Sequence, residues 1–452
     1  MKTRLLAVCA ATATVLLSPS GRAADLALVP RAEGWLVKSF GQIEVPAPQS
    51  PAQNEISELK AIIAKRTAED VARIRWWAAG GPVHRWNEIV LDELMDNFIT
   101  LPLAARHLAL LHAALDDAVA TAWQHRSSAA RPRPSVIDKS ITPVGVVPEG
   151  GSLPSDHAAA AAAAAEVLGH LFPGRANVFA AKAEEAIKAR LQAGVEYPSD
   201  VAAGRVIGQK IAALAIARGK ADRWDAKWTG SVPEGPGMWK GANPIAPAAA
   251  TWQPWVLVRP DELRPPAPPA FDSEQVKTAL SELKAFARAP KTNHRAVYWE
   301  VFGGARAHTL WNEIARAKLL EHGDAISPLV AARALAALNI AFFDAAIACW
   351  DAKYAYWYIR PSQSDADVKP LFPPPNHPSY PAAHGCLSTA AATILAGIFP
   401  RDSDRLLAHG KEAAEARIWA GIHYRFDIDA GQAIGRQVAE RTLERAFVKR
   451  AP

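Results

Sequence analysis

Three cationic side chains, two histidines and one carboxylate fall in a distinctive order within the last hundred residues of the chain. In chain order they are Lys353, Arg360, His384, Arg417, His423 and Asp427. An arginine binds two oxygens of an anion in a fork, and a lysine holds a further oxygen as a point charge. Few carboxylates stand near these cations in the sequence. The pattern therefore indicates a site for a multiply charged anion, and a tetrahedral oxyanion suits it best.

The two histidines are expected to act differently at this site. Asp427 lies one helical turn after His423, so its carboxylate would accept from one ring nitrogen and leave the other free as a ligand or nucleophile. His384 stands at the start of a predicted helix, whose first N–H groups add donors for an anion. It would act as a general acid or base. Each residue alone is usually a solvated side chain or half of a surface pair, so the order of the whole set carries the prediction.

The chain also repeats itself at a fixed offset of 227 residues. The segment 416–427 (ARIWAGIHYRFD) echoes 189–200 (ARLQAGVEYPSD), with Glu196 in the place of His423. Other identities on the same diagonal are Asp117 with Asp344, Trp123 with Trp350, Arg133-Pro134 with Arg360-Pro361, and Phe172-Pro173 with Phe399-Pro400. The phrase WNEI at 86–89 recurs at 311–314, offset by 225. These matches predict an internal duplication.

Both repeats are predicted to be helical, because Ala, Leu and Ile recur at helical spacing with polar residues on the opposite face. The predicted helices are 101–123, 157–171, 176–193 and 201–219 in the first repeat, and 328–353, 384–398, 402–421 and 427–448 in the second. Alternating β-branched runs are scarce. The predicted fold class is therefore all-α, with two helical bundles packed into one compact unit.

The chain divides into five predicted segments. They are a signal peptide (1–23), an N-terminal extension (24–80), a first bundle (81–220), a Trp- and Pro-rich connecting loop (221–300) and a second bundle that holds the oxyanion site (301–452). The signal is inferred from Lys2 and Arg4, the apolar run after them and a small-residue cleavage site ending at Ala23. The extension carries one expected helix near 52–79. Five tryptophans between 224 and 255 indicate that the connecting loop is ordered over the core.

Composition narrows the function classes. The net charge of +6 falls to +3 without the three basic residues of the leader, which gives no argument for a nucleic-acid partner. No later segment of about 18 residues is apolar and free of charge and glycine, so no membrane span is expected. Cys349 and Cys386 are too few for a disulfide scaffold, and their pairing stays open. The predicted location is periplasmic or secreted.

The three blocks of the second repeat resemble the signature of the phosphatidic acid phosphatase type 2 and vanadium-dependent haloperoxidase superfamily, K-x6-RP, PSGH and SR-x5-H-x3-D. The amino-acid sequence of 344–361 is similar to that of the bacterial haloperoxidase-like branch. The resemblance implies that vanadate or phosphate oxygens contact Lys353, Arg360 and Arg417. It implies His423 as the vanadium ligand or the phosphorylated residue, His384 as the acid–base residue and Asp427 as the group that orients His423.

The chain departs from this signature at three positions. Ala382 and Ala383 replace the Ser and Gly of PSGH, and Ala416 replaces the Ser before the arginine. Loss of the hydroxyl at 382 would cost an anion one hydrogen bond, roughly 1.5–3 kcal/mol, while the backbone N–H groups of 382 and 383 remain as donors. The first repeat, in which Glu196 replaces the ligand histidine, is interpreted as a vestigial copy.

The motif alone does not separate the activities of the superfamily. The resemblance favours a haloperoxidase that oxidises halide with hydrogen peroxide, because soluble, exported and doubled chains are typical of that branch. His377 is similar in spacing to a histidine of bromoperoxidases, which favours bromide or iodide over chloride. The alternative is an acid phosphatase that cleaves a phosphoester through a phosphohistidine at His423. A third hypothesis is a non-catalytic oxyanion-binding protein. Assembly into a homo-oligomer is also implied.

Overall fold

The structure, a computed structural model, describes residues 28–45, 52–97, 99–129, 131–304, 306–323 and 326–449. The predicted signal peptide lies outside these residues. The helices of the first half are α1 (Ala52–Ala64), α2 (Ala68–Ala78), α3 (His84–Asp96), α4 (Leu101–Ala129), α5 (Pro134–Ile137), α6 (Asp156–Leu171), α7 (Ala176–Gln192) and α8 (Pro198–Ala221). Those that follow are α9 (Glu274–Ala285), α10 (Pro290–Val301), α11 (Ala307–His322), α12 (Pro328–Tyr356), α13 (Pro361–Ser364), α14 (Ala383–Ile398), α15 (Ser403–Trp419) and α16 (Arg425–Ala446). The all-α prediction is confirmed.

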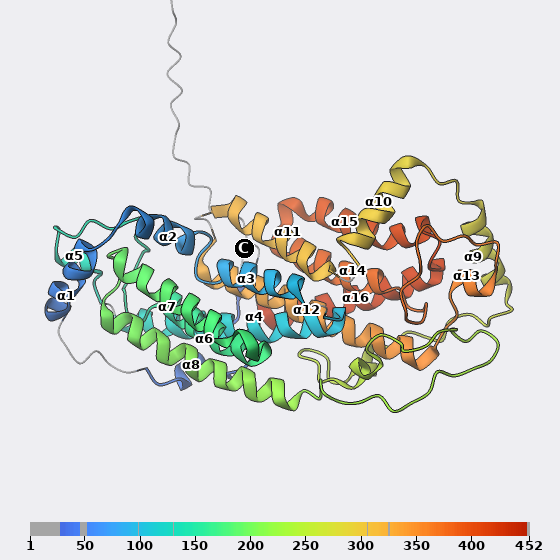
Figure 1. The fold of residues 1–452 in the computed structure, drawn as a ribbon, viewed down its shortest axis with the longest axis horizontal. Helices are drawn as coiled ribbons and strands as arrows, with labels where there is room; N and C mark the ends of the chain where they lie inside the picture. Colours follow the sequence, from blue (N-terminus) through green and yellow to red (C-terminus); the bar gives the residue numbers. More distant parts are fainter. Residues whose placement is uncertain are drawn as a thin grey trace, which may run out of the picture.

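The helices form an elongated molecule with two ends. Helices α5 to α8 lie toward one end and α13 to α16 toward the other, with α3, α4, α11 and α12 between them (Figure 1). Within the described residues the only named strands are β1 (Leu28–Pro30) and β2 (Phe447–Lys449), which pair antiparallel. This ribbon brings the first and last described segments of the chain together.

The element boundaries repeat along the chain. Helices α4, α5, α6 and α7 have counterparts α12, α13, α14 and α15 whose first and last residues lie 227 positions later, and α8 and α16 begin 227 positions apart. Each half also has a cis proline at the equivalent place, Pro154 and Pro381. This is the arrangement that an internal duplication would produce. The duplication itself stays a prediction.

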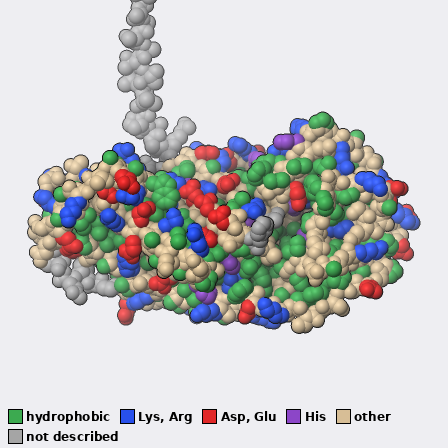
Figure 2. All heavy atoms as spheres, viewed as in Figure 1, with side chains coloured by type: hydrophobic (Ala, Val, Ile, Leu, Met, Phe, Trp, Pro, Cys, Tyr) green, Lys and Arg blue, Asp and Glu red, His purple; other side chains and the backbone are tan. Residues whose placement is uncertain are grey.

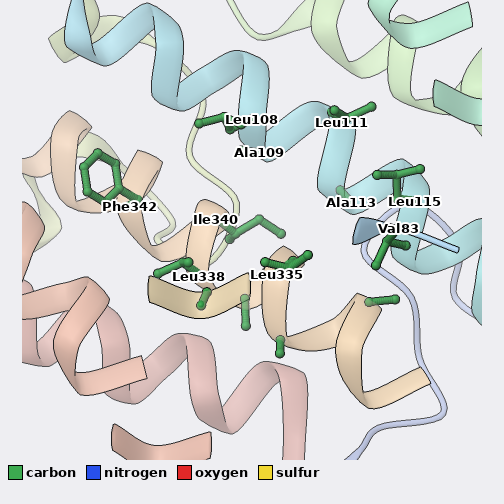
Figure 3. Close-up of a cluster of buried hydrophobic side chains, with 14 of the residues drawn as sticks. Val83, Leu108, Ala109, Leu111, Ala113, Leu115, Leu335, Leu338, Ile340 and Phe342 are labelled. Carbon is green, nitrogen blue, oxygen red and sulfur yellow. The ribbon is translucent and has the colours of Figure 1, made fainter. Parts of the chain in front are cut away.

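The two halves meet along α4 and α12. Both helices carry apolar side chains around most of their circumference, which is typical of a helix buried on all sides. Figure 3 shows the leucines of α4 facing the apolar residues of α12. The buried side chains drawn there include Leu108, Leu111, Leu115, Leu335, Leu338 and Phe342. Burial of this much apolar surface is the main stabilising term at the junction.

A buried amide network crosses the same junction. The Asn87 Nδ2 atom donates to Asn312 Oδ1 at 2.7 Å, so the asparagines of the two WNEI phrases bind one another. Asn312 and Asn339 exchange two further hydrogen bonds of 2.8 and 2.9 Å. Buried amides must be hydrogen-bonded, so this network favours one register of the two halves.

Two buried carboxylates fasten the outer segments to the bundles. Asp117 accepts from the backbone N–H groups of residues 35–37 at 2.8, 2.7 and 3.2 Å. Its counterpart Asp344 accepts from residues 255–257, with shortest distances of 2.8, 2.7 and 3.1 Å. Each carboxylate therefore replaces the backbone partners that these two non-helical segments lack.

Two expectations for the outer segments need correction. The segment 221–300 is not wholly a loop, because it contains α9 and α10, each of 12 residues. Pro290 at the first helical position starts α10, and Ser273 caps α9. The single helix expected near 52–79 is two helices, because Thr67 caps the N-terminus of α2 and ends the run.

Helix α12 is, among the described residues, the one helix long and apolar enough to cross a membrane by length and composition, and 94% of its most apolar window is buried inside the structure. Core helices of folded proteins share these properties. The expected absence of a membrane span stays a prediction.

The carboxylate clamp on the connecting segment can be tested with Asp344→Ala. The substitution leaves three N–H groups, one buried and two half-buried, without an acceptor, and one unsatisfied buried donor costs about 1–3 kcal/mol. We expect the free energy of unfolding in urea to fall by roughly 3–5 kcal/mol. The exposed Asp272→Ala control should change it by less than about 0.5 kcal/mol. Equal effects of the two substitutions would contradict the clamp.

Candidate active site

A cavity of about 190 Å³ opens beside the N-terminus of α14. Its polar lining includes Glu300, His377, His384, Arg417 and His423. Its apolar lining includes Leu101, Ile245, Ala307, Trp350, Leu387 and Ile422. Thr100 and Leu101 belong to the first half, so both halves build the wall.

On the face shown in Figure 2, hydrophobic side chains gather over the half that contains α11 to α16, whereas charged side chains crowd the other half.

Arg417, in the last turn of α15, is the cation that faces this cavity. Its Nη1 atom donates to Glu300 Oε2 at 2.8 Å and lies 2.9 Å from His384 Nε2. Its Nε and Nη2 atoms are buried and have no hydrogen-bond partner among the described residues. Burial lowers the pKa of Arg417 to about 10, so the group is still charged at neutral pH. Two buried, unsatisfied N–H groups on a cation are the donors an oxyanion requires.

His423 is held by a carboxylate on one side. Its Nδ1 atom lies 2.8 Å from Asp427 Oδ2, which also accepts from Ser379 Oγ at 2.6 Å and from the Tyr424 backbone N–H at 3.1 Å. These contacts place the proton of a neutral His423 on Nδ1 and leave Nε2 as the free lone pair. Arg360 Nη1 donates to this lone pair at 2.9 Å. A ligand on Nε2 would replace that hydrogen bond.

Lys353 and Arg360 are bound mainly to backbone carbonyls. Lys353 Nζ donates to the carbonyls of 378, 379 and 381 at 2.8, 3.0 and 2.5 Å. Arg360 donates to His377 O at 2.9 Å and to Ile422 O at 3.0 Å. Neither residue is part of the cavity lining. The two cations therefore fix the loop before α14 and the turn before His423, and only Arg360 touches a predicted ligand atom.

Burial sets the protonation states of the site. It lowers the pKa of His377, His384 and His423 well below the usual value, and neighbouring cations lower them further, so the three imidazoles are neutral. It also lowers the pKa of Lys353 to about 8 and raises that of Asp427 to about 6. His384 Nε2 lies 2.9 Å from the carbonyl of Trp299, which accepts its proton and leaves Nδ1 as the basic atom.

The two alanines of the second motif lie in different surroundings. Ala383 lines the cavity, as expected of an anion-binding position. Ala382 does not, because its side chain packs with Leu283, Val368 and Ile418 and its N–H donates to Asp427 O at 2.9 Å. The expectation that the Ala382 N–H remains available to an anion is therefore wrong. Ala382 is the N-cap of α14, with no side-chain cap.

Three contributing residues were not predicted. Ser379 lies within the motif segment, and a hydroxyl two positions before the cis Pro381 gave no separate signal. Trp299 and Glu300 come from α10, in the segment expected to be a loop, more than 80 residues from His384 and Arg417. Only the tertiary fold brings them to the cavity.

Part of the sequence and most of the fold are similar to those of known proteins. Residues 110–224 match the family model of the PAP2 superfamily. The fold is similar to a bacterial vanadium-dependent iodoperoxidase, with TM-score 0.63, 20% identity, and 80% of this chain and 95% of that chain covered. It is also similar to a bacterial vanadium-dependent chloroperoxidase in its apo form, with TM-score 0.54, 16% identity, and 76% and 92% covered. The PAP2 superfamily match thus covers part of the chain, and the solved structures, at 20% identity or less, show a shared fold.

Two curated proteins with similar sequence are non-specific acid phosphatases. One from Providencia stuartii is 29% identical over 92 residues, which is 20% of this chain and 37% of the relative. One from Salmonella typhi is 35% identical over 57 residues, or 13% and 23%. The chain thus matches less than half the length of either phosphatase.

The PAP2 match falls on the first bundle. Two residues there that are equivalent to the cations of the second bundle, the cradle residues Arg126 and Arg190, are paired with carboxylates. Arg190 donates to Glu196, and Arg126 pairs with Asp156 at 3.2 Å. His157, the counterpart of His384, is part of the same cluster, and burial lowers its pKa to about 4.

Two cysteines of the second bundle are buried and free. Cys349 and Cys386 contact one another through their thiols, and Cys349 Sγ lies 4.0 Å from Pro381 O. No disulfide joins them in this structure.

The role of position 382 can be tested with Ala382→Ser. The counterpart Ser155 caps α6 by accepting from Ala158 N at 3.0 Å, and such a cap contributes about 1 kcal/mol. We expect Ala382→Ser to raise the unfolding free energy by about 1 kcal/mol and to leave phosphate affinity unchanged. Ser155→Ala is the matched control and should lower stability by a similar amount. A phosphate affinity raised tenfold or more by Ala382→Ser would show that its hydroxyl reaches the anion.

The neutrality of His384 predicts a pH dependence of stability. The imidazole is uncharged when folded but titrates near 6.5 when unfolded, so its contribution is present above that pH and lost as pH falls. The free energy of unfolding of His384→Gln in urea should therefore fall less steeply than that of the wild type below about pH 6.5. The difference in slope should be up to about 1.4 kcal/mol per pH unit. His157→Gln should act in the same direction. Parallel pH profiles for wild type and His384→Gln would mean that this imidazole takes up its proton equally readily in the folded and unfolded protein.

Proposed function

We propose that the chain is an exported haloperoxidase-like enzyme that oxidises halide with hydrogen peroxide at a vanadate bound in the second bundle. The observation that carries the proposal is that Arg417 and His423 line one cavity. Arg417 is buried and has two N–H groups without a partner among the described residues. His423 is neutral, and its Nε2 lone pair lies on the side of the ring opposite to Asp427. The vanadium-dependent peroxidases of similar fold support it.

The residues present fit an oxyanion of this kind. Arg417 Nε and Nη2 would bind its oxygens, and His423 Nε2 would be the metal ligand in exchange for its contact with Arg360. Arg360 would then hold a further oxygen. Lys353 would join them by giving up one of its three carbonyl contacts. Bound vanadate supplies a Lewis acid that activates hydrogen peroxide toward attack by halide.

The chain's own groups would prepare this chemistry. Asp427 keeps the His423 proton on Nδ1, so that Nε2 stays a lone pair. His384, neutral and hydrogen-bonded to the Trp299 carbonyl through Nε2, has Nδ1 available to take a proton from peroxide. The apolar wall formed by Leu101, Trp350 and their neighbours limits water, which strengthens the electrostatic contacts inside.

The choice of halide rests on one residue. His377 lines the cavity, its Nδ1 atom lies 3.0 Å from Arg360 Nη2, and its ring packs on Trp350 at 5.4 Å between centroids. A histidine beside the cradle supports bromide or iodide over chloride. The two solved peroxidases of similar fold are named for different halides, iodide and chloride, and do not decide the matter.

Phosphoester hydrolysis is the second candidate, and the acid phosphatase relatives favour it. The same cradle would hold a phosphoryl group, because phosphate and vanadate are both tetrahedral oxyanions. His423 Nε2 would then attack phosphorus while the bond from phosphorus to the leaving oxygen breaks. His384, once protonated at Nδ1 from solvent, would give that proton to the leaving oxygen. Both candidate activities need the same geometry of the site, so an activity assay must distinguish them.

The proposal can be tested by assaying bromide oxidation by hydrogen peroxide in metal-stripped protein, with and without orthovanadate. We expect turnover that depends on vanadate in the wild type, none in His423→Ala, and a rate about 10- to 100-fold lower in Asp427→Asn, which loses the orienting carboxylate. His157→Ala, at the equivalent of His384 in the first bundle, is the matched control and should retain activity.

The other outcomes of this assay discriminate the alternatives. Phosphomonoester hydrolysis without bromide oxidation, abolished by His423→Ala, would assign the chain to the phosphatases. Failure of both reactions, with phosphate still bound by the wild type, would show that the second bundle binds an oxyanion without turning it over.

A further inference from the structure

The first bundle contains a second set of buried cations that the proposed function does not use. Arg126, Arg133 and Arg190 lie 227 positions before Lys353, Arg360 and Arg417, and all three are buried. Burying three guanidinium groups in one place is unfavourable unless anions neutralise them. The first bundle must therefore contain negative charge close to these three arginines.

The frame around these cations is the same as in the second bundle. Arg133 Nη1 donates to Val195 O at 2.9 Å, and Arg360 Nη1 donates to the equivalent Ile422 O at 3.0 Å. Arg126 donates to Pro154 O at 2.9 Å, as Lys353 donates to the equivalent Pro381 O. The backbone N–H of the helix cap donates to the carbonyl of Asp200 in one bundle and of Asp427 in the other, at 3.0 and 2.9 Å. Both halves thus retain the shape of a cradle.

The two cradles differ at the third arginine. Arg190 Nε and Nη2 both donate to Glu196 Oε1, at 3.2 and 2.9 Å. In Arg417 the same two atoms, Nε and Nη2, have no partner among the described residues. A carboxylate oxygen of the protein therefore lies on the fork that is open in the second bundle.

Glu196 behaves as an ionised ligand. Its side chain is completely buried, and although burial acts to raise its pKa, the charge of Arg190 and its hydrogen bonds lower that pKa below the usual value. Its other oxygen, Oε2, has no hydrogen-bond partner within the described residues. Asp156 neutralises Arg126 at 3.2 Å and accepts from Trp123 Nε1 at 2.8 Å. Two carboxylates thus stand where one oxyanion would be expected.

We propose that the first bundle is an oxyanion cradle whose ligand is built into the chain, the Glu196 carboxylate, and that removing this side chain opens a binding site for a free tetrahedral oxyanion such as inorganic phosphate. The site does not depend on the reaction of the second bundle, because it uses none of its residues. Glu196 is thus a structural counter-ion in the first bundle.

The test counts bound phosphate by equilibrium dialysis in the wild type, Glu196→Ala and Glu196→Gln. Glu196→Ala removes the charge and vacates the space, so we expect it to bind one phosphate per chain more than the wild type. Glu196→Gln removes the charge but fills the space, and should bind no more than the wild type. Because Glu196 is fully buried, the proteins are refolded from urea in phosphate before dialysis, and circular dichroism confirms the helical fold.

A double variant, Arg190→Met with Glu196→Ala, is the matched control, because it vacates the same space without the guanidinium fork. An extra phosphate in Glu196→Ala that is absent in the double variant supports the cradle. A folded Glu196→Ala without extra phosphate, or a double variant that binds equally, overturns it. If Glu196→Ala refolds poorly, recovery that rises with phosphate supports the proposal, and recovery independent of phosphate contradicts it. A wild type that binds no phosphate would weaken the proposed function alone.

Discussion

The constraint on which the second bundle depends is the burial of three cationic side chains. Lys353, Arg360 and Arg417 cannot keep their hydration shells there, so each N–H group must find another partner. Lys353 and Arg360 find theirs in backbone carbonyls, and this requirement fixes the course of the loop before α14 and the turn before His423. Arg417 has Glu300 on one nitrogen and two unsatisfied donors. These two donors are what the proposed function assigns to an anionic ligand.

The same burial prepares the neutral groups. Transfer out of water favours the uncharged imidazole, so His384 and His423 offer lone pairs rather than positive charge, whereas the guanidinium groups, with their much higher intrinsic pKa, stay charged. Cations that attract an oxyanion and bases that can bind or exchange protons therefore coexist within a few ångströms. In water an imidazole begins to take up a proton near pH 6.5, and burial extends its neutral form to lower pH.

Much of this could be predicted from the sequence, and the failures have physical reasons. The predicted helices agree with α4, α6 to α8, α12 and α14 to α16 within a few residues, because long Ala- and Leu-rich segments give a strong periodic signal. Helices α9 and α10 were missed because proline and tryptophan dominate the composition around them. Site residues at fixed spacing, such as His423 and Asp427, are set by one helical turn. Glu300 and Trp299 depend on contacts across the fold, which spacing cannot show, and the different surroundings of Ala382 and Ala383 depend on side-chain directions at a helix start.

The β1–β2 ribbon has a topological consequence. Because Leu28 pairs with Lys449, the described polypeptide is nearly a closed ring in which two similar halves alternate with two tethering segments, each clamped by an aspartate of α4 or α12. A ring has no preferred starting point. Joining residues 28 and 449 through a short linker and cutting the exposed stretch near 230 would therefore give a chain in which the site-bearing half is synthesised first, with every helix contact retained. The order of the halves along the chain is then a matter of synthesis, and not of the final architecture.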